Sequence, residues 1–165
     1  MKTIEELAAQ VGLPEEHREI VCIFLLVFSR FESALKQAGY ARQQGELLVV
    51  EWRRFARDTE ARCRAGEPMP VGAFRSLIDR PPARQRAIDD RLEWQPEPAP
   101  AIPPNLEWLL EMVYRVRNNL FHGGKCPLQP ERDLELMKAS LMALSHFLDL
   151  RLDVAQAYMA APAGA

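Results

Sequence analysis

The sequence has few of the residues that build metal and redox sites. Among its 165 residues there are three histidines and three cysteines, and no two cysteines form a Cys-x-x-Cys pair. An odd number of scattered cysteines argues against a disulfide framework and against a zinc site, and it fits the reducing conditions of the cytoplasm. We therefore expect a cytoplasmic protein that carries no metal and needs no cofactor.

Long hydrophobic runs and nucleotide-binding loops are also missing. The longest apolar run, Ile20–Phe28, has nine residues and is too short to span a bilayer. The N-terminus offers one lysine, then Glu5 and Glu6, and lacks the apolar stretch of a signal peptide. No Gly-x-Ser-x-Gly elbow occurs, and the pair Gly123-Gly124 follows a predicted helix, whereas a phosphate loop precedes one. We expect no membrane association.

Residues that favour strands are sparse, and residues that favour helices are frequent. Isoleucine, threonine and tyrosine are few, whereas leucine, alanine, glutamate and arginine dominate. The length fits one domain, 1–165, with a core at 14–150, an irregular proline-rich segment at 67–104 and a frayed tail at 160–165. We expect an all-α fold, an up-and-down bundle of four to five main helices.

Capping residues and helix breakers predict where these helices begin and end. Gly39 is the expected residue just past the end of the first long helix, and Asn105 is the expected N-cap of the helix that follows the prolines. The predicted helices are 4–10, 14–38, 46–64, 106–121 and 130–158, with short helices at 71–79 and 83–92. The run of prolines from Pro96 to Pro104 is predicted to be an extended loop.

Charge is unevenly distributed along the chain. The net charge is −2, yet the stretch Arg53–Arg91 holds ten arginines against six acidic residues. Every base in that stretch is arginine, whose planar fork suits phosphate best. A solvated helix face has the same composition, so both interpretations stay open. Arg53, Arg54 and Arg57 are the candidates for holding a nucleic-acid backbone.

One segment, Val113–Lys125, gathers polar groups at a predicted helix end. Arg117 falls on the helix stripe that is otherwise formed by Leu106, Leu110, Val113 and Leu120. A charge on an apolar stripe needs a partner or a function. Asn118 and His122 are neighbours one turn apart and project from the same face. An alternative is a surface arginine and a histidine that interacts with the helix dipole.

The run Arg117-Asn118-Asn119-Leu120-Phe121-His122 resembles the signature of the HEPN superfamily (higher eukaryotes and prokaryotes nucleotide-binding), in which arginine and a polar residue precede a histidine. Phe28–Lys36 and Pro81–Trp94 also resemble segments of such proteins. The resemblance implies a helical bundle that dimerises and cuts RNA, as a toxin or a defence effector with a separate antitoxin or regulatory protein. The tyrosine that one toxin group has two positions after the histidine is Gly124 here.

Arginine, asparagine and histidine have the chemistry for metal-independent RNA cleavage. Arg117 can grip the scissile phosphate, and His122 can move a proton at neutral pH. Asn118 could orient His122 or bind phosphate. One imidazole does not conveniently serve as both base and acid, and the dimer that the resemblance implies supplies a second. The expected product is a 2′,3′-cyclic phosphate.

Three further residues are candidates for a supporting role at this site, namely Glu32, Asn119 and Lys125. Glu32 could pair with Arg117 from the first long helix, or be an ordinary residue of its polar face. Two other functions stay open for the whole chain. One is a non-catalytic HEPN module that binds a nucleotide or a protein. The other is a helical adaptor in which the Arg117–His122 spacing is accidental.

Overall fold

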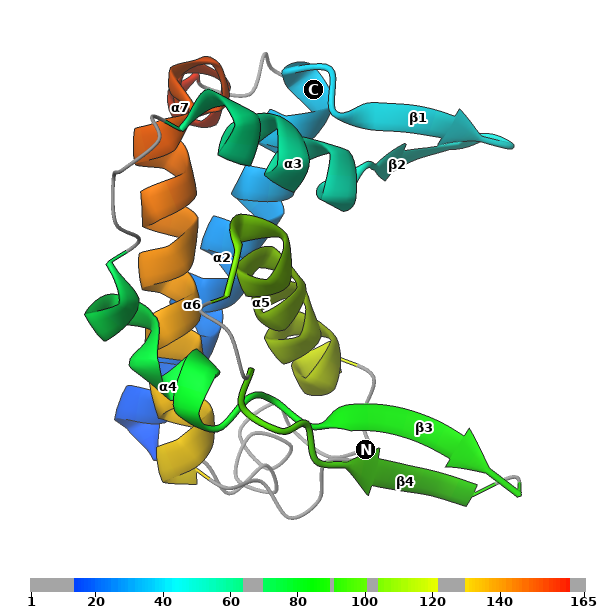
Figure 1. The fold of residues 1–165 in the computed structure, drawn as a ribbon, viewed down its shortest axis with the longest axis vertical. Coiled ribbons are helices and arrows are strands. Elements are labelled where there is room, and N and C mark those ends of the chain that lie inside the picture. Colours follow the sequence, from blue (N-terminus) through cyan, green and yellow to red (C-terminus); the bar gives the residue numbers. More distant parts are fainter. Residues whose placement is uncertain (1–13, 64–69, 90, 101–103, 122–129, 161–165) are drawn as a thin grey trace, which may run out of the picture.

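The computed structural model describes residues 14–63, 70–89, 91–100, 104–121 and 130–160, and most of them are helical (Figure 1). The helices are α2 (Glu15–Gln37), α3 (Trp52–Arg62), α4 (Arg75–Asp79), α5 (Leu106–Phe121), α6 (Pro130–Leu150) and α7 (Leu152–Met159), with a 3-10 turn at Val71–Phe74. The all-α prediction is confirmed only in part, because the fold is mostly helical but also has two small two-stranded sheets. The predicted helix 4–10 lies outside the described residues.

Helix α2 carries the aromatic core. Phe24, Phe28 and Phe31 recur at four- and three-residue spacing and are buried, as the inward stripe of a helix requires. Phe31 meets Phe55 of α3 edge to face, with ring centroids 5.7 Å apart, and it also lies 6.3 Å from Phe147 of α6. Such aromatic pairs add to the stability that burial of their area provides. The core therefore joins α2, α3 and α6.

Both helix caps that the sequence predicts are present. Gly39 has a φ of 84°, and the amide of Tyr40 donates to the carbonyl of Leu35 at 2.8 Å, which closes the end of α2. At the start of α5, Oδ1 of Asn105 accepts a hydrogen bond of 2.8 Å from the amide of Trp108. Local capping chemistry thus places the ends of both helices.

The predicted helix 46–64 is wrong in its first part, where the chain forms a hairpin. Strand β1 (Ala41–Gln44) pairs antiparallel with β2 (Leu47–Val50), and α3 begins only at Trp52. Gly45 has a φ of 61° at the first loop position, which fits a type II′ turn. The β-branched Val49 and Val50 suit a strand, and pairing with the preceding segment outweighs the helical pattern.

The predicted short helix at 83–92 is also wrong. Strand β3 (Arg84–Ile88) pairs antiparallel with β4 (Arg91–Gln95), in a register that sets Arg84 opposite Gln95. Asp89 has a φ of 48° in the turn, a conformation that aspartate tolerates. Prolines on both sides leave too few residues for a stable isolated helix. The predicted helix at 71–79 is confirmed as the 3-10 turn followed by α4.

The last predicted helix, 130–158, is interrupted at Arg151. This residue has φ −130° and ψ 85°, outside the helical region, and separates α6 from α7. Its side chain is buried, and its guanidinium bonds to Thr59 and Tyr40 from distant parts of the chain. The helix is therefore interrupted at the residue whose side chain points into the interior.

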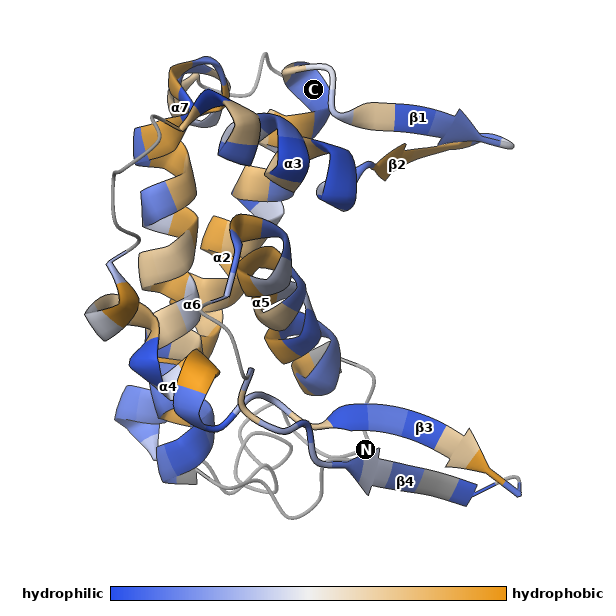
Figure 2. Ribbon diagram, viewed as in Figure 1, coloured by the Kyte–Doolittle hydropathy of each residue, from blue (hydrophilic) through white to orange (hydrophobic). Residues whose placement is uncertain are grey.

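The two hairpins project from the same side of the helices, with α5 between them (Figure 1). Helix α2 packs on α6 and α7, and α5 packs on α3 and α6. Most residues of α3 and of strands β1 and β3 are hydrophilic, in contrast to those of β2 (Figure 2). The exposed side of α5 therefore lies between arginine-bearing elements.

Candidate functional site

Arg117 and Asn118, which the sequence singles out, are hydrogen-bonded to each other near the end of α5. Both side chains are half-buried, and Nη1 of Arg117 donates to Oδ1 of Asn118 at 3.0 Å. The guanidinium carbon of Arg117 also lies 5.8 Å from the ring centroid of Phe28 on α2. An aromatic face favours a nearby cation. The structure thus holds Arg117 between α5 and α2, at the edge of the aromatic core.

The other predicted site residues have separate places. His122 and Lys125 lie outside the described residues. Asn119 is buried, and its Nδ2 donates to the carbonyl oxygen of Ala83 at 2.9 Å, so it holds the chain before β3 against α5. Glu32 forms an ion pair with Lys36, one turn along α2, and its carboxylate lies 3.0 Å from Nζ of that lysine.

A buried arginine that sequence reasoning missed fastens the proline-rich segment to α5. Arg115 is 7% exposed. Its Nη1 donates to Glu97 at 2.5 Å and to the carbonyl of Pro82 at 3.2 Å, and its Nη2 donates to Glu111 at 2.9 Å. Charge-assisted bonds of this kind are strong, and this set ties both ends of the β3–β4 segment to α5. The second hairpin is thereby positioned beside the motif.

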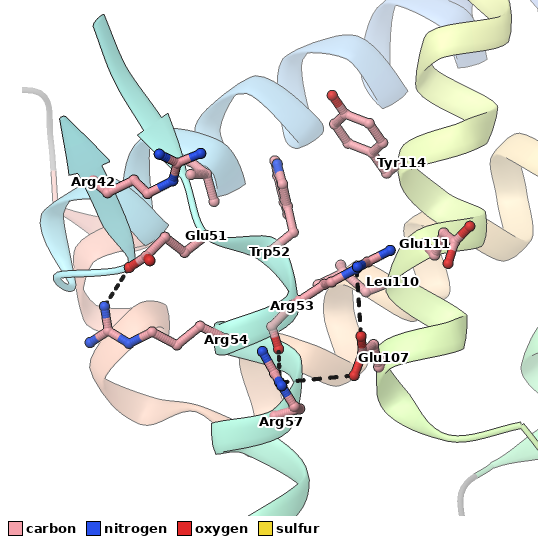
Figure 3. Close-up of a pocket in the computed structure, with 11 residues that line it drawn as sticks. Arg42, Glu51, Trp52, Arg53, Arg54, Arg57, Glu107, Leu110, Glu111 and Tyr114 are labelled. Atoms are coloured by element: carbon pink, nitrogen blue, oxygen red, sulfur yellow. Dashed lines mark hydrogen bonds and ion pairs between the residues drawn. The ribbon is translucent and has the colours of Figure 1, made fainter. Parts of the chain in front are cut away.

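A hollow of about 510 Å³ lies between α3 and α5, and Figure 3 shows the side chains around it. Arg53 and Arg57 reach from α3 toward Glu107 of α5, whereas Arg54 turns away toward Glu51 (Figure 3). The lining residues are Arg42, Val50, Glu51, Trp52, Arg53, Arg54, Arg57, Glu107, Leu110, Glu111 and Tyr114. The three arginines that were expected to hold a nucleic-acid backbone, Arg53, Arg54 and Arg57, therefore line one hollow.

A second hollow of about 270 Å³ meets the first along α5. Its lining residues are Arg84, Gln85, Glu111, Tyr114, Arg115, Asn118 and Asn119. Glu111 and Tyr114 line both hollows. Glu107, Glu111, Tyr114 and Asn118 are spaced by four, three and four residues and share one face of the helix. We call the two hollows together the α5 groove, which leads from α3 to the neighbour of Arg117.

The α5 groove has six arginines and three glutamates in its lining, and the pairing between them is uneven. Nη1 of Arg54 bonds to Glu51 at 2.5 Å, and this hydrogen bond raises the pKa of Arg54 above its ordinary value. Nε of Arg53 and Nε of Arg57 lie 3.6 and 4.0 Å from the carboxylate of Glu107. Arg53 and Arg57 are therefore held more loosely than Arg54.

Tyr114 and Trp52 form an aromatic wall that sequence reasoning did not assign to a site. Their ring centroids are 5.5 Å apart, and Tyr114 is 38% exposed. Behind them, Trp52 stacks on Phe28 at 5.4 Å with 29° between the ring planes. In the sequence, Trp52 has the spacing of a core residue. Only the approach of α3 to α5 reveals that it lines the groove.

Among the described residues, no group of three or more histidine, cysteine, aspartate or glutamate side chains could hold a metal ion. Within the same residues, every helix is too short or too polar to cross a membrane. Comparison of the chain with protein-family models, with curated proteins and with solved structures gave no match.

Proposed function

We propose that this protein is a metal-independent endoribonuclease of the HEPN type, with Arg117, Asn118 and His122 as its catalytic residues. The observation that carries the proposal is the position of Arg117. It is a half-buried cation bonded to Asn118, which lines the end of the α5 groove. A guanidinium fixed beside an arginine-lined groove is suited to grip a phosphodiester.

The proposed reaction is attack of a ribose 2′-hydroxyl on the adjacent phosphorus. His122 removes the hydroxyl proton, and Arg117 stabilises the negative charge that develops on the phosphate oxygens. A second imidazole, from the partner of a two-fold dimer, protonates the leaving 5′-oxygen. The products are a 2′,3′-cyclic phosphate and a 5′-hydroxyl, and DNA is not cut because it lacks the nucleophile.

The proposal includes the remaining expectations from the HEPN resemblance. These are the up-and-down helical bundle, the homodimer, a cytoplasmic toxin–antitoxin or defence setting, and a separate antitoxin or regulatory protein. The packing of α2 on α6, and of α5 on α3 and α6, supports a helical assembly of this kind. Lys125 and Glu32 stay supporting candidates in this proposal, whereas the bond of Asn119 to Ala83 favours a structural contribution.

A non-catalytic HEPN module that binds a nucleotide is the second candidate. The observation in its favour is the α5 groove itself, where Trp52 and Tyr114 lie beside arginines. A nucleotide offers a base for aromatic rings and a phosphate for guanidinium groups. Tight nucleotide binding by a protein that leaves RNA intact would support this function and contradict the ribonuclease.

The test is RNA cleavage in the presence of EDTA, with wild type compared with His122→Ala and Arg117→Ala. Arg75→Ala is the control, because Arg75 is exposed and pairs with Asp79 of its own helix. We expect wild type and the control to leave 2′,3′-cyclic phosphate ends, and both motif variants to be inactive. A folded, dimeric wild type that cuts none of the RNAs offered would contradict the ribonuclease.

A further inference from the structure

We propose that the α5 groove is a binding track for single-stranded nucleic acid. In this track Arg53 and Arg57 grip a phosphate in place of Glu107, and a base stacks on Tyr114. The inference rests on the proposed function only for what happens to the bound strand, because the groove ends at Asn118, the hydrogen-bond partner of Arg117. The binding itself depends only on the groove.

Arg53 and Arg57 form a paired cationic site with a weakly held carboxylate. They lie one turn apart on α3, their side chains are 78% and 67% exposed, and both approach Glu107. Their distances to that carboxylate, 3.6 and 4.0 Å, exceed the 2.7–2.9 Å or so of a good charge-assisted hydrogen bond. An exposed ion pair of this length contributes little, so a phosphate can take the place of the carboxylate.

Tyr114 is the stacking surface of the proposed track. It is partly exposed, and its ring is braced by Trp52 and Phe28, with centroids 5.5 and 6.4 Å away. A braced ring loses little conformational freedom when a base stacks on it. Base–aromatic stacking also tolerates any base, because every base has a π-face. The groove is therefore expected to bind strands with weak sequence preference.

The groove runs along α5 toward the catalytic motif. Glu107 and Asn118 are eleven residues apart, which is about 16 Å at the helical rise of roughly 1.5 Å per residue. At about 3.4 Å per nucleotide along one strand, this length corresponds to roughly five stacked nucleotides. Tyr114 lies between these ends and lines both hollows. A strand held by Arg53 and Arg57 can thus extend past Tyr114 to Asn118, the hydrogen-bond partner of Arg117.

The aromatic wall favours a single strand over a duplex. A base can stack on Tyr114 only if it has left its neighbours, and duplex bases are stacked inside the helix. The cationic pair binds phosphates of RNA and DNA alike, since neither Arg53 nor Arg57 needs a 2′-hydroxyl. Single-stranded DNA should therefore occupy the groove and inhibit RNA cleavage, although it is not itself cut.

The test measures fluorescence anisotropy of a labelled 2′-O-methyl RNA, which keeps bases and phosphates but cannot be cleaved. The groove variants are the double variant Arg53→Gln with Arg57→Gln, and Tyr114→Ala. The matched control is Arg75→Gln with Arg80→Gln. It changes charge equally, and both residues are exposed, pair with acids and lie outside the groove lining. Thermal melting followed by circular dichroism checks that each variant folds.

We expect the groove double variant to bind at least about tenfold more weakly than the control. Its salt dependence should also fall, by a slope of roughly 0.7 for the one phosphate that is no longer neutralised. Tyr114→Ala should bind about tenfold more weakly, with the slope unchanged. Equal affinities of groove and control double variants would overturn the track, as would a wild type that does not bind the probe.

Cleavage of unmodified RNA separates this inference from the proposed function. Groove variants that lose binding, with a wild type that binds but cuts nothing, would support the track and contradict the ribonuclease. A wild type that cuts RNA, with groove variants that bind and cut at the same rate, would overturn the track and leave the ribonuclease standing.

Discussion

Two groups of arginines in this molecule have opposite surroundings. Arg151, between α6 and α7, is 1% exposed and donates to Asp153, Thr59 and Tyr40. Its guanidinium carbon also lies 4.9 Å from the ring centroid of Tyr40. Arg53 and Arg57 are exposed and share one distant carboxylate. All three nitrogens of the Arg151 guanidinium have partners, whereas Arg53 and Arg57 can accept a new one.

This contrast indicates which arginines are available to bind a ligand. A buried guanidinium whose three nitrogens all donate hydrogen bonds stabilises the fold, and removing it leaves its partners unsatisfied. An exposed guanidinium in a weak ion pair contributes little to folding and can exchange its partner for a phosphate. Arginine-rich composition alone does not separate the two, whereas burial and bond geometry do.

The largest expected effect is that of removing Arg151. We expect Arg151→Ala to lower the free energy of unfolding by about 3–5 kcal/mol, because the hydroxyls of Thr59 and Tyr40 lose a partner and Asp153 loses its nearest counter-charge. Urea denaturation measures this loss. Arg75→Ala is the control and should change stability by at most about 0.5 kcal/mol. An equally small change in the free energy of unfolding of Arg151→Ala would contradict the distinction between the buried and the exposed arginines.

Arg115 is a second buried arginine with several partners, and it lies beside the segment that precedes the motif. Arg115→Ala removes its bonds to Glu97, Glu111 and the Pro82 carbonyl, and we expect a loss of about 2–3 kcal/mol. Amide hydrogen exchange should become faster in β3 and β4, whose attachment to α5 depends on these bonds. Unchanged exchange in both strands would show that Arg115 does not fasten the hairpin.

Substitution of Glu107 tests whether its carboxylate competes with phosphate for Arg53 and Arg57. In Glu107→Gln, Arg53 and Arg57 no longer have a carboxylate that a phosphate must displace. We expect 2′-O-methyl RNA to bind a few-fold more tightly, with stability within about 0.5 kcal/mol of wild type. Weaker binding would mean that Glu107 positions the arginines, and would contradict its displacement by phosphate.

The smallest expected effect concerns His146, which packs against Phe74. Burial lowers the pKa of His146 below its ordinary 6.5, and Asp149 opposes this shift. Between the folded pKa and 6.5 the unfolded chain binds more protons, so stability falls as the pH drops through this window. Urea denaturation at about pH 7.5 and 5.5 should show a smaller pH effect in His146→Gln. An equal effect would assign the pH dependence to other groups.

The sequence predicts features that depend on a few neighbouring residues. Gly39 and Asn105 identify helix ends because each cap involves only the adjacent turn. The hairpin β1–β2 was not predicted, because 46–51 also has helical periodicity and its partner, Ala41–Gln44, has no strong strand composition. The break at Arg151 was missed for a similar reason, since the contacts that accompany it come from α3 and the end of α2.

The same limit applies to the candidate site. Adjacent residues of a helix do not face each other, so the hydrogen bond between Arg117 and Asn118 could not be predicted, but their presence at one helix end could. The α5 groove could not, because Arg53 and Glu107 are far apart in sequence and meet only when α3 packs on α5. Likewise, nothing in the local sequence indicates that Arg115 bonds to Glu97.

The most direct test of the central claim is to measure stability and RNA cleavage together in Arg117→Gln, in EDTA and at fixed protein concentration. Cleavage should be lost while the free energy of unfolding, measured by urea denaturation, stays within about 1 kcal/mol of wild type, because Arg117 is half-buried and serves the reaction more than the fold. A variant that still cuts RNA at the wild-type rate would contradict the catalytic assignment of Arg117.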